Sequence, residues 1–333
     1  MNISEQPEYQ FLKTNPRLGK NIIFLTYGGS YAYGTNVEGS DIDLRGCTLN
    51  SKQDLLGVGN FEHVVDGETD TTVYAFNKMI SLLINCTPSV IEMLGCKPEH
   101  YLIRTPIGEQ LLDRRKMFLS RRAAASFGGF ANQQLRRLEN ALAHDAYPAE
   151  VKERHIANSC QQAIFTFPER YSSFTPDQIK LSVAEVNGRE QVVADVNMEQ
   201  MPLRMFTGMI SELVDTARDF DKLHHRNRKK DDAHLNKHAM HLVRLYLMCL
   251  DILEKEEIVT YREADHDLLM AIRGGEYQNA DHTFNSAFYD LLNNLENRFA
   301  YARENTALPE EPDMKQIEEF QMEVNERVVR NEI

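Results

Sequence analysis

The first third of the chain alternates short apolar runs with glycine-rich and polar turns. Strands are predicted over the apolar run 21–25, over the alternating segment 41–45 and over residues 70–76. Helices are predicted over 77–85 and 88–94. Pro88 suits the first turn of the second helix, and Gly95 ends it. Strands that lead into helices within about 110 residues indicate a small α/β unit.

From Arg114 onward the pattern changes to the spacing of amphipathic helices. The helices predicted there cover 118–143, 150–165, 202–223, 234–254, 265–272 and 314–329. One segment interrupts this pattern, because residues 179–196 consist of two alternating runs joined by Asn187-Gly188, which predicts a β-hairpin. The final helix is amphipathic and serves either as a packed cap or as an oligomer contact. The pattern therefore divides the chain into three segments: residues 1–115, a helical part over 116–300 that contains the hairpin, and an acidic helix and tail over 301–333.

The composition is that of one or two globular domains, with 333 residues, 42% hydrophobic and 26% charged. The 37 Lys and Arg against 50 Asp and Glu give a formal net charge of −13 and a pI near 5.4. Such a surface repels nucleic acids and anionic membranes as a whole. A generally basic nucleic-acid binder is therefore excluded, and any polyanion must meet a local basic patch.

Compartment and redox state are indicated by the termini and the cysteines. The five cysteines are odd in number and contain no C-x-x-C pair, which favours reduced thiols over disulfides or structural zinc. Residues 1–7 lack a basic and apolar signal sequence, and no run approaches the ~20 apolar residues of a membrane span. We expect a cytoplasmic protein with no membrane partner.

The segment with the clearest chemistry joins Gly28-Gly29-Ser30 to Asp41-x-Asp43. On a strand, Asp41 and Asp43 would share one face while Ile42 and Leu44 face the core. Paired carboxylates repel unless a cation lies between them, and oxygen ligands completed by phosphates suit Mg²⁺. We expect two Mg²⁺ ions, for which Mn²⁺ can substitute. Glycines and the amides after Ser30 can hold phosphate oxygens, so the expected ligand is a metal-bound nucleoside triphosphate (NTP).

A two-metal site also needs a third carboxylate. Asp70 is the first candidate because it opens the next predicted strand, and Glu68 and Asp66 remain alternatives. The expected reaction is in-line attack of an acceptor hydroxyl on the α-phosphorus, with pyrophosphate as the leaving group.

Basic side chains offer further candidate contacts. One face of a predicted helix carries a stripe of basic side chains, formed by Lys237, His241 and Arg244. His234 and Tyr246 could extend it. The stripe is either a clamp for the triphosphate or a solvated helix face. Arg45 follows Asp43 on the same strand face and could reach phosphate or acceptor. The basic run 222–230 is a solvated linker in preference to a nucleic-acid track; weaker basic candidates are Arg136-Arg137 and Arg114-Arg115-Lys116.

Gly29-Ser30, Asp41-x-Asp43 and a later strand acid resemble the signature of the DNA-polymerase-beta-like nucleotidyltransferase superfamily. More closely, the chain is similar to the RNA-ligase-associated polymerase-beta-like (RlaP) family of predicted nucleotidyltransferases. The similar segments cover most of residues 21–277; they are 29–34, 40–46, 88–94, 130–137, 237–245 and 269–275.

This resemblance implies an α+β fold, with a catalytic core over 1–115 and a helical domain over 116–300 that binds nucleotide and acceptor. It implies Mg²⁺-dependent nucleotidyl transfer from an NTP. The residues implied in catalysis and metal binding are Asp41, Asp43 and Asp70; those implied in nucleotide binding are Gly29, Ser30, Lys237, His241 and Arg244. The acceptor stays open among an RNA or DNA end, a protein and a small molecule. Two alternatives are an inactive NTP-binding regulatory or sensor protein and a nucleic-acid-binding module.

Overall fold

The chain is described here by a computed structural model that covers residues 6–146, 149–226 and 232–333. It divides into two compact units, the first of Met1–Leu135 with Asn236–Ile333 and the second of Arg136–Leu235. The three segments expected from the sequence therefore group differently in space. Helices after residue 236 join the N-terminal part because their apolar and charged side chains pack against it, as the pairs Phe76–Phe320 and Glu92–Arg244 show.

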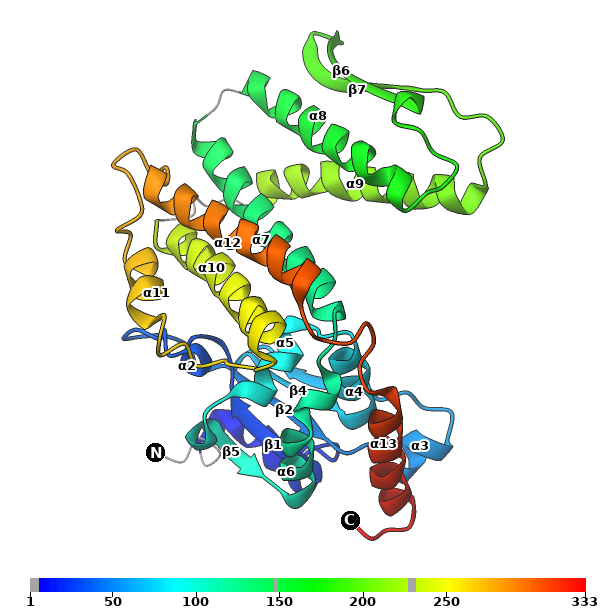
Figure 1. Cartoon of the computed structure of the whole chain (residues 1–333), viewed down its shortest axis with the longest axis vertical. Coiled ribbons are helices and arrows are strands. Elements are labelled where there is room, and N and C mark those ends of the chain that lie inside the picture. The colour runs from blue at the N-terminus through cyan, green and yellow to red at the C-terminus, as the bar shows by residue number, and fades with distance from the viewer. Residues whose placement is uncertain (1–5, 147–148, 227–231) are drawn as a thin grey trace. The chain divides into compact units, whose positions relative to one another are not determined.

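A five-stranded mixed sheet forms the centre of the first unit (Figure 1). Its strands are β1 (Ile22–Tyr27), β2 (Leu44–Thr48), β3 (His63–Asp66), β4 (Thr71–Ala75) and β5 (Tyr101–Arg104). The strand order is β3-β4-β2-β1-β5, in which β2 and β4 are parallel and the other neighbours antiparallel. The mixed sheet with many helices confirms the α+β fold.

The second predicted strand is wrong at its start. Residues 41–43 precede β2, which begins at Leu44, so Asp41 and Asp43 do not lie on a strand. The ladder ends there because the partner strand β1 stops at Tyr27, where the chain turns into α2 (Gly29–Tyr33). Ile42 still packs partly against the core beside the fully buried Leu44, so the expected apolar side of the segment is retained.

Helices surround this sheet and account for the rest of the first unit. They include α3 (Lys52–Leu56), α4 (Phe76–Ile84), α5 (Pro88–Ile91), α6 (Pro106–Asp113), the start of α7 (Arg122–Ala146), most of α10 (Asp232–Lys255), α11 (His266–Arg273) and α12 (Ser286–Asn305). Sequence patterns predicted α4, α5, α7, α10 and α11. They missed α12, which begins at Ser286. The preceding residue, Asn285, caps this helix, because its side chain accepts a hydrogen bond from the Phe288 amide at 3.1 Å.

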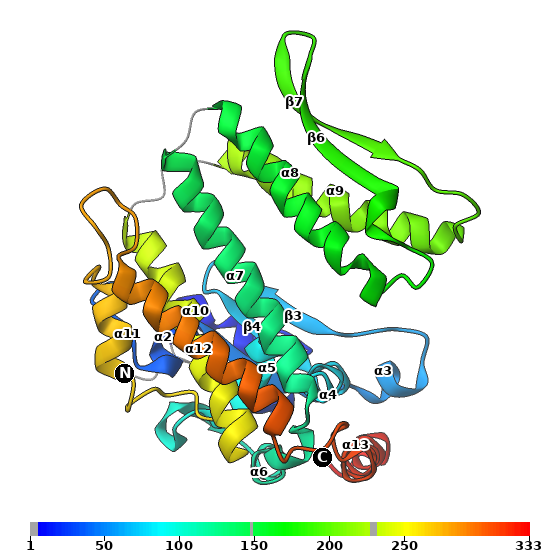
Figure 2. The same ribbon diagram turned by 45° about the horizontal axis from the view of Figure 1, so that its top comes forward.

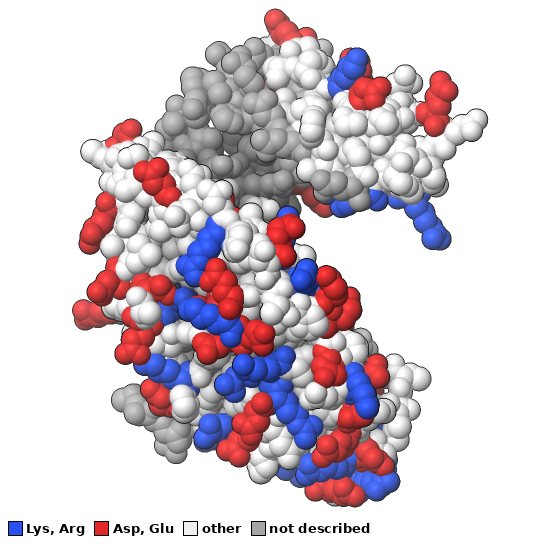
Figure 3. All heavy atoms as spheres, in the orientation of Figure 1, with Lys and Arg blue, Asp and Glu red and all other residues white. Residues whose placement is uncertain are grey.

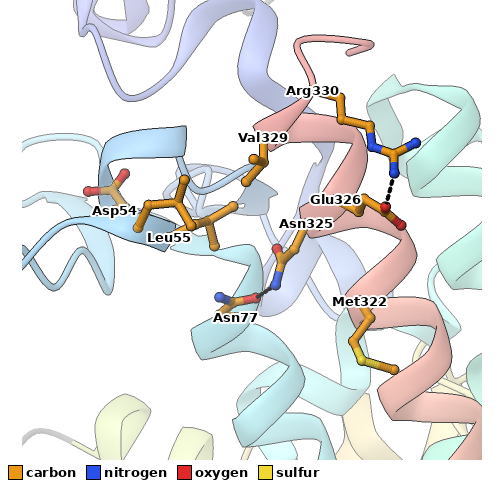
Figure 4. A pocket seen from close by; sticks show the side chains of 9 residues that line it. Asp54, Leu55, Asn77, Met322, Asn325, Glu326, Val329 and Arg330 are labelled. Carbon is orange, nitrogen blue, oxygen red and sulfur yellow. Dashed lines mark hydrogen bonds and ion pairs between the residues drawn. The ribbon is translucent and has the colours of Figure 1, made fainter.

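The last helix, α13 (Met314–Val329), matches its predicted limits and packs against the core. Its inward face buries Ile317, Phe320 and Val324, and the Phe320 ring lies 5.8 Å from that of Phe76. This agrees with the packed-cap role. An open groove of about 500 Å³ remains between α3 and α13, lined in part by Leu55 (Figure 4).

The second unit contains α8 (Ala149–Thr166), α9 (Leu203–Arg226) and the hairpin β6 (Ile179–Val186) and β7 (Arg189–Val196) (Figure 2). The hairpin is confirmed at the predicted residues. Asn187 and Gly188 have φ angles of +55° and +74°, the left-handed values that a two-residue turn requires. Its inner side joins a small core with Ile164, Phe167 and Met209.

The cysteines and the helix lengths can be compared with what the sequence predicted. All five cysteines are free, and four of them are buried, as expected for small core residues. Within the described ranges, no helix is both long and apolar enough to cross a bilayer.

Candidate active site

Two of the predicted acids meet where two neighbouring strands begin. Asp43 directly precedes β2, and Asp70 directly precedes β4. Because β2 and β4 are parallel with Leu44 opposite Thr71, the residues before them are also neighbours. Asp70 has a φ of +43°, a left-handed conformation uncommon for residues other than glycine and often found at functional sites.

The charge state of Asp43 reflects this proximity. Burial raises the pKa of Asp43 to about 6, and the hydrogen bond and negative charge of Asp70 act in the same direction. The positive charges of Arg45 and Lys237 act in the opposite direction and lower the pKa of Asp43. Arg45 also forms an ion pair with Asp70, with 3.2 Å between Nη2 and Oδ1, and donates to the Asp70 carbonyl. The predicted residues Asp43, Asp70, Arg45 and Lys237 therefore share one electrostatic environment.

The other candidate acids lie in different surroundings. Asp66 accepts hydrogen bonds from the amide and hydroxyl of Thr69, at 2.9 and 2.7 Å, and so stabilises the turn between β3 and β4. Glu68 is exposed in that turn. Asp41 is exposed two residues before Asp43. In the described part of the chain no three His, Cys, Asp or Glu side chains are gathered as a metal site, so the structure joins Asp43 with Asp70 and leaves Asp41 apart.

The glycine-rich turn approaches Asp43 closely. The Gly28 amide donates to the Asp43 carbonyl at 2.8 Å. Gly29 begins α2 with a φ of +54°, and a Cβ built on it would lie 1.8 Å from Asp43 Oδ2. Only glycine accommodates both the backbone angle and this contact. Ser30 follows on α2, 9% exposed, so the predicted phosphate-binding turn lies directly against the acid pair.

Replacing Gly29 with alanine is therefore expected to displace the Asp43 carboxylate. We expect a loss of activity of about 10- to 100-fold, since an ångström-scale misplacement costs on the order of 10²-fold. Steady-state rates of nucleotide transfer, the activity expected from the sequence, measure the effect. Gly39→Ala is the matched control, because Gly39 has a φ of +80° but nothing within 4 Å of its Cβ position. Equal losses in the two variants would mean that backbone strain alone is responsible.

The helix stripe on α10 separates into residues with different surroundings. Lys237 is exposed, and its charge acts on Asp43. The ring of His241 meets that of Tyr33 edge-on at 6.0 Å. Burial holds the pKa of His241 well below its usual range, and neighbouring cations lower it further; these are Arg244, Lys237, His238 and Arg273. His241 is therefore neutral at pH 7.

Arg244 is committed to a buried interaction. It is 5% exposed, its Nη1 lies 3.2 Å from Glu92 Oε2, and its guanidinium lies 3.6 Å from the centre of the Tyr33 ring. The Tyr33 hydroxyl donates to the other Glu92 oxygen at 2.9 Å. This network joins α2, α10 and the turn after α5. Tyr246 is likewise buried, and its hydroxyl donates to Glu296 on α12 at 3.3 Å instead of extending the stripe.

Sequence reasoning missed Tyr33, Glu92 and Arg273. Arg273, the last residue of α11, donates from Nη1 to the carbonyl of Thr35, just after α2. Each lies within a segment that resembles the RlaP family, yet no local spacing assigns it a role. Their contacts join residues 59 to 238 positions apart in the chain.

Two of the weaker predicted basic candidates are engaged by other groups. Arg114 lies 5.0 Å over the Phe320 ring, and Arg115 donates to the Leu112 carbonyl at 2.8 Å, whereas Arg137 is exposed. Acidic and basic side chains are interspersed on the described surface drawn in Figure 3. The basic run 222–230 lies outside the residues whose side chains are described.

No curated protein and no solved structure matches the chain. A family model does match, and its span of residues 3–154 contains Gly29, Ser30, Asp41, Asp43 and Asp70. The resemblance predicted from the sequence is thereby confirmed: residues 3–154 of this chain match RlaP, the RNA repair pathway DNA polymerase beta family.

Proposed function

We propose that this chain is a nucleotidyltransferase that transfers a nucleoside monophosphate from an NTP to an acceptor hydroxyl. The observation that carries the proposal is the placement of Asp43 and Asp70 side by side before the paired strands β2 and β4, with Asp43 against the glycine turn of Gly28 and Gly29. Acids beside a turn that can cradle phosphates are the parts such a reaction needs. The family match over residues 3–154 supports the same reaction class.

The acid pair has the chemistry of a Mg²⁺ site. The negative charge of Asp70 helps to raise the pKa of Asp43, and a divalent cation between the two carboxylates would relieve this repulsion. Their oxygen donors suit Mg²⁺ or Mn²⁺. In the proposal Asp43 and Asp70 hold the metal. Asp41 lies apart from this pair in the structure and would join it as a further carboxylate only when the ions bind, two in total. The metal would supply neutralisation of the phosphate charge and activation of the attacking hydroxyl.

The side chains around the pair have distinct proposed roles. Ser30 and the amides of its turn hold phosphate oxygens, and Lys237 adds a positive charge near Asp43. Arg45 orients Asp70 through their ion pair. The bond from the acceptor oxygen to the α-phosphorus forms as the bond from that phosphorus to the bridging oxygen breaks. Pyrophosphate leaves, and Asp70 accepts the hydroxyl proton.

An RNA end is the proposed acceptor. The support is the description of the matching family as part of an RNA repair pathway. The net charge of −13 includes acids at the proposed centre that metal would neutralise and acids after Asn305, so it describes the whole surface and not the site.

Labelled transfer identifies the acceptor. The full-length protein is incubated with Mg²⁺ and each α-³²P-labelled NTP, against separate pools of RNA, DNA and cell protein. We expect label on RNA with the native protein and none with Asp43→Asn. Label confined to DNA or protein would refute the RNA acceptor, and binding of NTP without label in any pool would favour a sensor.

A further inference from the structure

Arg273 is a half-buried cation that contacts the end of the glycine-rich turn. Its Nη1 donates to the Thr35 carbonyl, two residues after α2 ends at Tyr33. Burial lowers the pKa of Arg273, and no carboxylate contributes to that shift. Among the residues that the structure describes, no acid forms an ion pair with it. One nitrogen is thus fixed to the backbone, which leaves the rest of a planar donor fork.

Lys237 on α10 is a second cation, which acts on one of the same neighbours as Arg273. Lys237 is exposed, forms no ion pair among the described residues, and acts on Asp43. The charges of Lys237 and Arg273 both lower the pKa of His241, whose ring meets Tyr33 on α2. Figures 1 and 2 both place α2 beside α10 and α11, which carry these two cations. The helices that α2 borders therefore carry two cations, one of them bonded to the chain just after α2.

This arrangement is unfavourable without an anion. A guanidinium that is partly removed from water loses hydration, and this cost is offset only when an anion lies beside it. The other buried arginines offset this cost with acids, as Arg244 does with Glu92 and Arg262 does with Asp251. A phosphate group satisfies the same requirement, since its oxygens match the fork of an arginine.

We propose that Arg273 and Lys237 bind the β- and γ-phosphates of the NTP, the part that leaves as pyrophosphate. This inference rests on the proposed function, because it assigns the leaving-group end of the same site. Asp43 and Asp70 then lie at the α-phosphate, with the glycine turn between the two ends. Arg273 is fixed by Thr35, so its fork is ordered before the nucleotide arrives.

Equilibrium dialysis of ³²P-labelled pyrophosphate with Mg²⁺ tests this without requiring turnover. We expect Arg273→Met to weaken pyrophosphate binding about 10- to 100-fold, the range for charge-assisted hydrogen bonds. Binding of a nucleoside monophosphate, measured in parallel, should change less than about threefold. Arg273→Lys keeps the charge without the fork and should give an intermediate loss. Arg303→Met is the control, because Arg303 is exposed and pairs with Glu304.

Unchanged pyrophosphate affinity in Arg273→Met, or no binding by the native protein, would overturn the inference. Equal weakening of pyrophosphate and monophosphate would also overturn it, because it would mean that Arg273 only supports the turn at Thr35. Melting temperatures of both Arg273 variants verify folding. If the methionine variant does not fold, the pyrophosphate affinity of Arg273→Lys is compared with that of the native protein instead. Failure of the proposed function is distinguishable: the native protein would then bind pyrophosphate through Arg273 yet transfer no nucleotide.

Discussion

Asp43→Asn is expected to reduce nucleotide transfer by about a thousandfold or more while the protein stays folded. Loss of the carboxylate proposed to bind metal would remove several kcal/mol of charge stabilisation, and each 1.36 kcal/mol is a factor of ten in rate. The fold should tolerate the change because Asn has nearly the same volume and the Asp43 carbonyl still accepts from the Gly28 amide. Single-turnover rates with labelled NTP measure the loss, and melting temperatures verify the fold.

Glu68→Gln is the matched control for this prediction. Glu68 lies in the turn that leads to Asp70, is exposed, and has the same carboxylate chemistry. We expect Asp70→Asn to reduce the rate strongly and Glu68→Gln to leave it within about twofold, as surface substitutions usually do. A large loss in Glu68→Gln with retained activity in Asp70→Asn would assign the third carboxylate to Glu68 instead.

Removing one partner of the Glu92–Arg244 pair is expected to give the largest loss of stability. The two side chains are 11% and 6% exposed, so Arg244→Met leaves a buried carboxylate without its cation. Breaking a buried pair in this way costs about 3–5 kcal/mol in the free energy of unfolding. Urea unfolding curves measure the change. The effect should reach the active site too, because Tyr33 on α2 shares Glu92 and contacts the guanidinium.

The double variant distinguishes charge from packing. Glu92→Leu with Arg244→Met removes both charges and should recover part of the loss, since apolar replacements of a whole buried pair are often neutral. Arg303→Met, at an exposed pair with Glu304, should change stability by less than about 1 kcal/mol. A loss below about 1 kcal/mol in Arg244→Met would show that the pair does not hold α10 to the core.

Features governed by local chemistry were predictable from the sequence. Asn187-Gly188 placed the hairpin because few residue pairs adopt two consecutive positive φ angles. The final helix 314–329 was equally clear, since Asp313 caps its first turn and its apolar positions recur at helical spacing. The close approach of the glycine turn to Asp43 also has a local cause, since Gly29 has a positive φ and leaves no room for a Cβ.

Features set by distant partners were not predictable. The spacing of Lys237, His241 and Arg244 suggested one common role. Arg244, however, is buried and pairs with Glu92, which lies 152 residues away in sequence. Residues 41–45 alternate like a strand, yet the length of β1 decides where pairing begins. Arg273 shows no helical or motif spacing, and only its contact with Thr35 indicates a role.

The position of the transferred label tests the central claim most directly. The protein is incubated with Mg²⁺, RNA and ATP labelled at either the α- or the γ-phosphorus. Nucleotidyl transfer predicts that α-label becomes bound to RNA, that γ-label appears in pyrophosphate, and that both signals vanish in Asp43→Asn. Transfer of γ-label to RNA, or release of labelled inorganic phosphate without labelled RNA, would contradict the assignment of Asp43 and Asp70 to nucleotidyl transfer.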